Sequence, residues 1–526
     1  MSQNPYYLTT PIYYVNSVPH LGTAYTTIAA DVLARYRRML GDDVFFLTGL
    51  DEHGQKIAQA AEEHGVSPQE WVDSIAPKFR EVWDLLNISN DDFIRTTEPR
   101  HERAAQALMQ KLKDEGFIYE GRYEGWYCVP DETFFTAEQL VEAKCPDCGR
   151  PVEFVEENNW FFKLSAFEDR LLAHYAACDA EGVPFIQPES RKNEVLSFVH
   201  SGLRDLSVSR TAFTWGIPLP FDSAHVMYVW FDALINYITA CGFGADGTPT
   251  FTGDHAHYWP ADVHFVGKDI IRFHCVIWPA MLMAAGLPLP KQIFAHGFLL
   301  TKGEKMSKSK GNAMSPSELV SQFGVDAYRY YFMREVQFGS DGSISLEAMV
   351  QRYNADLAND WGNLCSRLFN MVGKFCEGLV PDPSDASEST ADDDEMKAIV
   401  AGLPSAFSEK MAVLDYSGAL EAVWELVKRS NRYIEDAAPW NLAKSDETMP
   451  RLRAVLYNAL EAVRVAALFT APVMPETSRE VWSRMGLGDP IAVTDLAAEA
   501  VWGRLPVGNT VVKGEALFQR IVEAAE

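Results

Sequence analysis

The chain has 526 residues, of which 47% are hydrophobic, so it is long enough for three or four packed units. Its formal charge of −27 repels nucleic acid at long range, so any contact with RNA requires a local basic patch. The sequence shows neither a charged leader with an apolar core nor a run of about 18 apolar residues, so we expect a soluble, cytoplasmic protein. Eight scattered cysteines do not resemble a disulfide framework.

A strand, a helix and a second strand are predicted first, at Tyr6–Thr10, Ala24–Leu40 and Val44–Leu47. The turn before the helix contains His20, Gly22 and Thr23, and a helix N-terminus after such a turn can hold phosphate. There His20 can donate to phosphate oxygens, Gly22 allows close approach of an adenine ring, and Thr23 supplies a hydroxyl. Read alone, His20 is equally well a capping or packing histidine.

Asp51 comes directly after the second strand, within the run Leu50-Asp51-Glu52-His53-Gly54. The carboxyl ends of the strands in a doubly wound sheet open onto a ligand crevice, so Asp51 is a candidate to hold an α-ammonium group. A solvated acid in a turn is the alternative. Further on, Ser67 and Glu70 have the spacing of a capping box that opens a helix.

From Gly116 the sequence becomes aromatic and β-prone, which indicates an insert between two halves of an α/β domain. Within it, Cys128, Cys145 and Cys148 have the spacing of a zinc knuckle, and Asp131 stands where a fourth ligand is expected. A site with three cysteines and one aspartate is unusual. A reduced, metal-free remnant is therefore the alternative.

After the insert, a buried strand is predicted from Val226 that runs into a helix. On this segment Trp230 and Tyr237 form either an apolar wall or part of the ordinary core, and Asp232 could accept hydrogen bonds from ribose hydroxyls. Two further strands are predicted, at Val263–Val266 and Ile293–Leu300. Because strands alternate with helices, the expected fold class is α/β, with a Rossmann-like, doubly wound and mainly parallel sheet.

The last of these strands leads into the run TKGEKMSKSKGN, from Thr301 to Asn312. A flexible loop of alternating ammonium and hydroxyl groups can surround a polyphosphate and neutralise the charge that develops when an α-phosphate is attacked. Lys308 is the leading candidate for this role, supported by Lys305 and His20. An ordinary exposed basic loop is the alternative.

After Asn312 the chain is predicted to be almost wholly helical, with one long or bent helix at 346–375 and an acidic loop at 381–395. Asn363 and Arg367 are four residues apart on that helix, so they share a face. Trp440 follows Pro439 and offers a ring on which an unstacked base could lie. Taken alone, the pair suits a surface hydrogen-bonding couple and the tryptophan suits a core.

Together these motifs resemble those of the methionyl-tRNA synthetases, over essentially the whole chain. The lysine loop resembles the KMSKS motif of class I aminoacyl-tRNA synthetases, and Pro19 to Gly22 resembles their HIGH motif, although Thr23 replaces the usual second histidine. The motifs that mark methionine are Leu50 to Gly54, Trp215 to Pro218, Tyr228 to Ala233, Gly267 to Ile270 and Ala438 to Trp440.

The resemblance implies a catalytic domain in two halves, an insert called the connective peptide, a KMSKS and stem-contact region and a helical anticodon-binding domain, at 1–116 and 226–300, 117–225, 301–364 and 365–526. It places ATP at His20, Gly22, Thr23, Asp232, Lys305 and Lys308. It places methionine at Ile12, Tyr14, Asp51, Trp230, Tyr237, Ile270, Phe273 and His274, with Asp51 on the ammonium group. The anticodon is placed at Asn363, Arg367 and Trp440.

The reaction implied has two steps. The methionine carboxylate attacks the α-phosphate of magnesium-bound ATP, and the adenylate then acylates the 3′ end of initiator and elongator methionine tRNA. The resemblance also implies a monomer, and the cysteine cluster predicts at most one structural zinc ion. Two alternatives are a class I synthetase for another apolar amino acid, whose hydrolytic domain would not fit this short insert, and a non-catalytic tRNA-binding paralogue.

Overall fold

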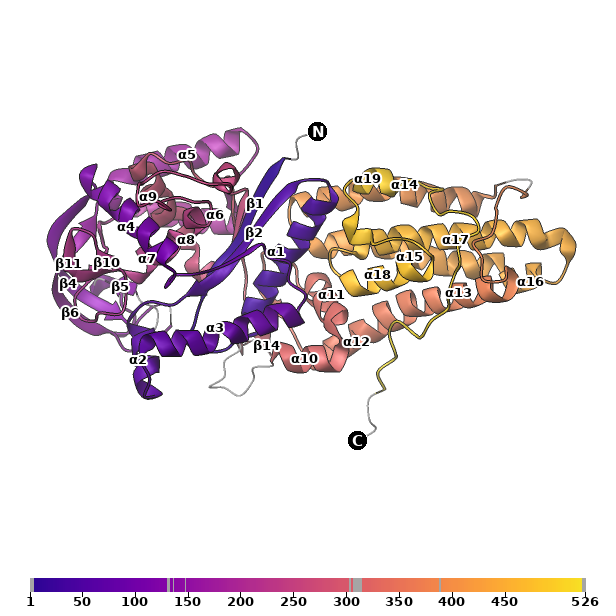
Figure 1. Ribbon diagram of the computed structural model, residues 1–526, viewed down its shortest axis with the longest axis horizontal. Helices are drawn as coiled ribbons and strands as arrows, with labels where there is room; N and C mark the ends of the chain where they lie inside the picture. The colour runs from indigo at the N-terminus through magenta and orange to yellow at the C-terminus, as the bar shows by residue number, and fades with distance from the viewer. Residues whose placement is uncertain are drawn as a thin grey trace.

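The computed structural model describes residues 4–129, 133–135, 137–146, 148–301, 304–305, 315–386 and 389–522. The molecule is elongated, with a layered α/β half at one end and a group of long helices at the other (Figure 1).

Among the described residues, six parallel strands form the central sheet of the α/β half, in the order β3-β2-β1-β12-β13-β7. They are β1 Pro5–Tyr14, β2 Asp43–Asp51, β3 Asp92–Arg95, β7 Ile186–Gln187, β12 Val263–Gly267 and β13 Ile293–His296. All but the first residue of β2 are buried, as expected for a parallel strand covered on both faces. The predicted doubly wound α/β sheet is therefore confirmed.

The helices of the α/β half are α1 Leu21–Met39, α2 Gln55–Glu63, α3 Pro68–Leu85, α4 Pro99–Asp114, α7 Val229–Leu234, α8 Asn236–Thr239, π-helix η5 Phe273–Ile277 and α9 Trp278–Ala285. The capping box predicted at Ser67 is confirmed, because its side chain accepts from the Glu70 N–H and the Glu70 side chain accepts from the Ser67 N–H. Helix α1 is the next element after β1, so the turn predicted to bind phosphate lies at the carboxyl edge of the sheet.

The insert is built around an antiparallel sheet in the order β5-β4-β6-β8. Its elements are β4 Ile118–Cys128, β5 Thr133–Phe135, β6 Glu153–Phe162, α5 Glu168–Ala180, α6 Glu189–His200, β8 Leu206–Ser207, β9 Ser209–Arg210, β10 Pro218–Leu219 and β11 Asp222–Met227. Strand β7 also lies within 117–225, yet it pairs with β13 as an edge of the main sheet. The insert therefore contributes an edge strand to the main sheet.

Two of the predicted strands need correction. The strand at Val226 is β11, which pairs antiparallel with β9 and β10 rather than joining the main sheet. The strand predicted over 293–300 is interrupted at Gly297, where an added Cβ would lie 2.3 Å from the carbonyl carbon of Ser340. Only a glycine permits that close approach. Beyond it, β14 Leu299–Thr301 leaves the main sheet and pairs with β15 Glu304–Lys305 and β16 Gly342–Ser343.

The helical half contains α10 Pro316–Phe323, α11 Val325–Glu335, α12 Leu346–Arg352, π-helix η7 Tyr353–Gly362, α13 Asn363–Phe375, α14 Ala391–Ala412, α15 Tyr416–Ala437, α16 Pro439–Leu442, α17 Met449–Thr470, α18 Pro475–Arg484 and α19 Leu496–Glu499. The long or bent helix predicted at 346–375 is confirmed, because α12, η7 and α13 follow one another without a break. The predicted acidic loop ends early, since α14 begins at Ala391.

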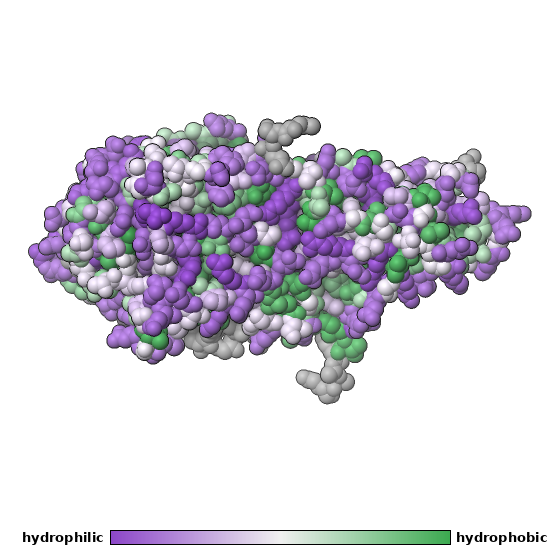
Figure 2. Space-filling model, viewed as in Figure 1, coloured by the Kyte–Doolittle hydropathy of each residue, from purple (hydrophilic) through white to green (hydrophobic). Residues whose placement is uncertain are grey.

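Hydrophilic residues dominate the face of the molecule shown in Figure 2, and its hydrophobic residues lie in small groups. In the part of the chain that the structure describes, there is no helix with the length and apolar character needed to cross a membrane.

Candidate active site

A cavity of about 330 Å³ opens at the carboxyl edge of the main sheet, beside the N-terminus of α1. Ten of its lining residues were predicted from the sequence as ligands of methionine or ATP, namely Ile12, Tyr14, His20, Gly22, Thr23, Asp51, Trp230, Tyr237, Ile270 and His274. They come from positions more than 250 residues apart in the chain, which the parallel sheet brings to one edge.

His20 caps the helix that borders the cavity. Its Nδ1 accepts hydrogen bonds from the backbone N–H groups of Gly22 and Thr23, at 3.1 and 3.3 Å. Because Nδ1 accepts, a neutral His20 ring carries its proton on Nε2, where it is a donor. An added Cβ on Gly22 would lie 3.0 Å from Cε1 of the His20 ring, so glycine permits the ring to fold back over the helix.

Thr23 has a structural task that the sequence analysis did not foresee. Its hydroxyl donates to the His20 carbonyl at 2.7 Å and accepts from the His20 N–H at 3.0 Å, which completes a capping box. Thr23 does line the cavity. Its hydroxyl, which was predicted to contact ATP, already donates its proton to the backbone.

The first strand is irregular where it reaches the cavity. The register between β1 and β2 shifts between Thr9 and Ile12, at Pro11, which lacks a backbone N–H for the ladder. Beyond the shift, Tyr14 pairs with Asp51, and both line the cavity. The Tyr14 hydroxyl donates to the His53 carbonyl at 2.9 Å, which fixes its ring against the end of β2.

Aromatic rings form one wall of the cavity. Trp230 of α7 stacks on Phe273 of η5, with ring centroids 4.0 Å apart and planes 13° from parallel. Trp230 lines the cavity and Phe273 packs against its ring, so Phe273 supports this wall, and its predicted contact with methionine stays a prediction. Among the described residues, the indole N–H of Trp230 has no hydrogen-bond partner.

Tyr237 and His274 form a buried pair on the same side. The Tyr237 hydroxyl lies 2.7 Å from His274 Nε2, and His274 Nδ1 lies 3.0 Å from the Ile270 carbonyl. Since a carbonyl only accepts, His274 donates from Nδ1 and the Tyr237 hydroxyl donates to Nε2. Burial lowers the pKa of His274 to about 4, so the ring is neutral at pH 7.

The prediction that Asp232 binds the ribose of ATP is wrong. Its side chain is fully buried, and its two oxygens lie 2.7 Å from His53 Nδ1 and 2.6 Å from His101 Nε2. Burial alone raises the pKa of Asp232, but its attraction to His53 and its hydrogen bonds with both histidines outweigh this and lower the pKa to about 2. Asp232 is an anion held inside the protein.

Several lining residues were missed by the sequence analysis. Asn236 lies one position before Tyr237, and its Nδ2 donates to the Ala233 carbonyl at 2.6 Å. A polar residue inside the apolar run ALINY was the available signal. His296 ends β13, and its Nε2 lies 2.7 Å from the Thr26 hydroxyl of α1. Nothing in the local sequence connects these two positions.

Comparison with known proteins identifies the family. Residues 6–153 and 138–369 match the family described as tRNA synthetases class I (M), and residues 380–526 match the anticodon binding domain of methionyl tRNA ligase. The methionine–tRNA ligase of Caldanaerobacter subterraneus is 50% identical over 98% of this chain and 79% of its own length. The chain belongs to the methionine–tRNA ligase family.

Two further relatives are similar to this chain in sequence or in structure over nearly its whole length. The methionine–tRNA ligase of Streptomyces coelicolor is 48% identical over 98% of this chain and 97% of its own length. A structure of the Mycobacterium tuberculosis methionyl-tRNA synthetase in complex with methionyl-adenylate is 45% identical and superposes with a TM-score of 0.93, covering 98% of this chain and 100% of that one. The class I synthetase resemblance and the helical anticodon-binding region predicted from the sequence are confirmed.

The residues just before the predicted lysine loop border the cavity. Phe298 and Leu299 line the cavity, and β14 then pairs with β15 through Leu300 and Lys305. Lys308 lies outside the described residues, and Lys305 is described only as part of β15. Their predicted roles in catalysis remain predictions.

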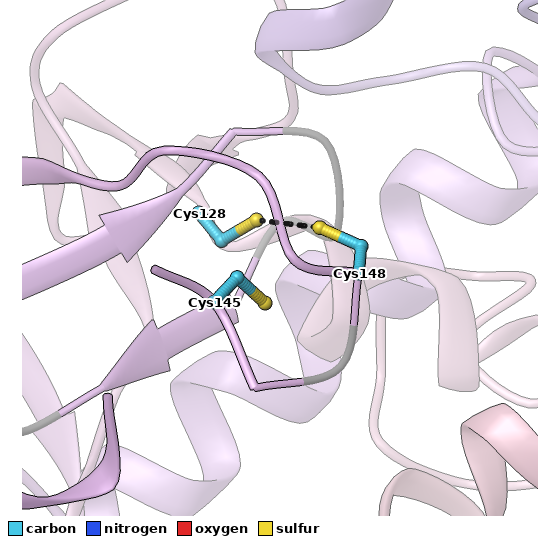
Figure 3. Close-up of side chains that lie close together, drawn as sticks. All are labelled: Cys128, Cys145 and Cys148. Atoms are coloured by element: carbon cyan, nitrogen blue, oxygen red, sulfur yellow. Dashed lines mark hydrogen bonds between the residues drawn. The ribbon is translucent and has the colours of Figure 1, made fainter. Parts of the chain in front are cut away.

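Three cysteines of the insert come together as expected for a metal site. All possible ligand sulfurs of Cys128, Cys145 and Cys148 lie within 4.8 Å of one another, and the Cys128 and Cys148 sulfurs are 3.6 Å apart (Figure 3). Thiolates about 2.3 Å from a tetrahedral zinc ion are about 3.8 Å from one another, so the cluster fits zinc. Asp131, the predicted fourth ligand, lies outside the described residues.

The predicted anticodon residues are accessible at the far end of the helical half. Asn363 is exposed at the start of α13, and Arg367 one turn later is 3.6 Å from Glu435 near the end of α15. Three positions after α15 ends, Trp440 is 44% exposed on α16. A core role for Trp440 is therefore excluded, and the Arg367–Glu435 contact shows that α13 and the end of α15 lie side by side.

Proposed function

We propose that methionine and ATP react in the cavity at the carboxyl edge of the main sheet. As a member of its family, the chain activates methionine with ATP to methionyl-adenylate and pyrophosphate, and then transfers methionine to tRNA. The observation that carries the assignment to this cavity is that Asp51, Trp230 and Tyr237 line it together with His20.

In this proposal Asp51 receives the methionine ammonium group, because a nearly buried carboxylate at the end of β2 pairs strongly with a cation. The side chain enters the wall formed by Trp230, Tyr237 and His274. The Tyr237 hydroxyl proton is already donated to His274, so this pair offers no proton to a polar side chain. A flexible thioether beside aromatic rings is then favoured over a polar side chain of similar length.

ATP lies with its phosphates at the N-terminus of α1. There His20 donates from Nε2 and the helix dipole favours negative charge. The methionine carboxylate is itself the nucleophile: its oxygen bonds to the α-phosphorus, and the bond to the pyrophosphate oxygen breaks. No general base is needed. Lys308 and Lys305 meet the charge that grows on the pyrophosphate, and magnesium bound with ATP supplies further neutralisation there.

The test is ATP–pyrophosphate exchange measured with each of the twenty amino acids. We expect exchange with methionine alone, which distinguishes this chain from a ligase for another apolar amino acid and from a non-catalytic paralogue. Lys308→Ala should lower the exchange rate by about a hundredfold or more with little change in methionine affinity. The reason is that the negative charge that Lys308 neutralises develops only in the transition state. A decrease below about tenfold contradicts the role of Lys308.

The remaining assignments concern RNA and metal. We propose that Asn363, Arg367 and Trp440 read the methionine anticodon, through hydrogen bonds and stacking on an unpaired base. Cys128, Cys145 and Cys148 would hold one structural zinc ion, with Asp131 or water as the fourth ligand. Elemental analysis of protein purified without chelator should find about one zinc per chain. Protein that contains no zinc and is fully active would contradict the zinc assignment. A cytoplasmic monomer completes the proposal.

A further inference from the structure

A buried carboxylate and two buried histidines connect three elements around one end of the cavity. Asp232 of α7 lies between His53, which follows β2, and His101 of α4, at 2.7 and 2.6 Å. The three side chains are between 0% and 5% exposed. We call them the His–Asp–His clamp.

The clamp connects the two groups that receive opposite ends of methionine in the proposed function. His53 is two residues after Asp51, the carboxylate for the ammonium group, and Asp232 is two residues after Trp230, the ring beside the side chain. Both neighbours line the cavity. The clamp therefore fixes the separation between the ammonium site and the side-chain wall.

His101 is the clamp member best suited to a test, because it lies on a different element from both methionine-binding groups. Its Nδ1 is 3.3 Å from the Thr239 hydroxyl, which donates to the Ile235 carbonyl at 3.0 Å, so α8 holds the ring in orientation. Without His101, one oxygen of a fully buried anion would lose its donor. Such a group is costly to leave unsatisfied, so α7 would move to find another donor.

We propose that His101 is a positioning residue for methionine, which acts through Asp232 to set Trp230 relative to Asp51. It thereby determines both the affinity for methionine and the length of side chain that the wall accepts. The inference rests on the proposed function of the cavity, which methionine-dependent exchange by the unmodified protein tests separately.

The experiment compares His101→Leu with His101→Gln in ATP–pyrophosphate exchange. Glutamine places an amide donor where His101 has Nε2, whereas leucine fills the space without a donor. We expect the leucine variant to raise KM for methionine by about tenfold and KM for ATP by less than about threefold. The glutamine variant should stay within about threefold of the unmodified protein for both substrates.

A second measurement is the ratio of kcat/KM for methionine to that for ethionine, which is longer by one methylene. This ratio should decrease in His101→Leu, because a displaced wall no longer excludes the longer chain, and a smaller folded fraction cannot change it. His225→Leu is the matched control. His225 forms another histidine–aspartate contact, 3.4 Å from Asp222, on β11 and outside the cavity lining, so neither KM nor the ratio should change.

Three results would overturn the inference. They are equal increases in both KM values, a decrease in kcat alone, and a glutamine variant as impaired as the leucine variant. If His101→Leu does not fold, Thr239→Val tests the inference in its place. It removes the hydroxyl beside Nδ1 at nearly constant volume, and it should raise KM for methionine by more than about threefold while KM for ATP changes by less than that. No change in KM for methionine then overturns the inference.

Discussion

His20 uses one ring nitrogen for the fold and leaves the other as a donor. Nδ1 caps α1 through the N–H groups of Gly22 and Thr23, and this fixes the proton of the neutral ring on Nε2. Capping and phosphate binding are thus compatible, because the cap orients the ring that the proposed function uses. Thr23 stabilises the N-terminus of α1, because at position N3 its side chain completes the capping box with His20.

Gly22→Ala tests whether this orientation matters. The new Cβ would lie 3.0 and 3.1 Å from two atoms of the His20 ring, so the ring must shift. We expect the exchange rate to decrease by up to about a hundredfold, since small misplacements of a group that acts in the transition state are costly. Gly402→Ala is the control, because an added Cβ there meets no atom within 4 Å in the structure as described. Equal rates in the two variants would contradict the role of the His20 orientation.

His274 makes stability depend on pH. Burial lowers its pKa from 6.5 to about 4, so between these values the unfolded chain binds a proton that the folded chain does not. Stability is therefore fully present above pH 6.5 and is lost as pH decreases through this window, by about 3 kcal/mol in total for this group. The thermal midpoint should decrease from pH 7.5 to pH 5. His274→Gln should reduce that decrease, and an unchanged decrease would contradict the assignment.

At the scale of elements, local sequence patterns predicted the helix features that depend on contacts between neighbouring residues. The capping box at Ser67, the helix after His20 and the uninterrupted helix over 346–375 all depend on neighbours within a few residues. The acidic run from Asp392 was predicted as loop because its partners are distant: Arg429 pairs with Asp392 and Glu395, and the acids favour the N-terminus of α14.

Distance along the chain also explains which parts of the site were predicted and which were missed. Asp51 and Trp230 belong to motifs that can be read within a few residues, and the resemblance assigned them to methionine. The burial of Asp232 depends on His53 and His101, which are 179 and 131 residues away. His296 meets Thr26 across 270 residues. Contacts of this kind require the sheet topology before they can be predicted.

The end of α15 shapes the proposed anticodon site. Ala438 adopts a left-handed conformation with φ of 42°, and Pro439 then begins α16 with Trp440 exposed beside it. Trp440→Ala should leave exchange nearly unchanged and weaken aminoacylation of methionine tRNA by about 1–3 kcal/mol, the value of one stacked base. Trp424→Ala is the contrasting variant, because Trp424 is 1% exposed and should impair both reactions through folding. Equal damage to both reactions in Trp440→Ala would withdraw the anticodon assignment.

At the scale of the whole molecule, one buried guanidinium joins the two halves. Arg329 of α11 is fully buried, and its Nη2 lies 2.6 Å from Asp31 of α1. The same side chain donates to the carbonyls of Leu86, Pro472 and Val473, at 3.0, 2.9 and 2.8 Å. Helix α1, the end of α3 and the turn between α17 and α18 therefore meet at a single side chain.

Arg329→Ala should therefore destabilise the protein far more than the loss of an exposed ion pair. It leaves three buried carbonyls without this donor and removes one of the two arginines that pair with Asp31, whose pKa is lowered to about 2. Removing one partner of a buried pair costs about 3–5 kcal/mol. Arg479→Ala, which breaks the exposed contact with Asp489 at 2.9 Å, should cost at most about 1 kcal/mol.

Activity separates this junction from the RNA site. Asp31 lies on the helix that His20 caps, so displacement of α1 in Arg329→Ala should lower exchange as well as aminoacylation, unlike Trp440→Ala. Thermal midpoints of the arginine variants, measured beside both reactions, test the argument. A midpoint for Arg329→Ala equal to that of Arg479→Ala, or a loss of aminoacylation with exchange intact, would show that α1 keeps its position without Arg329.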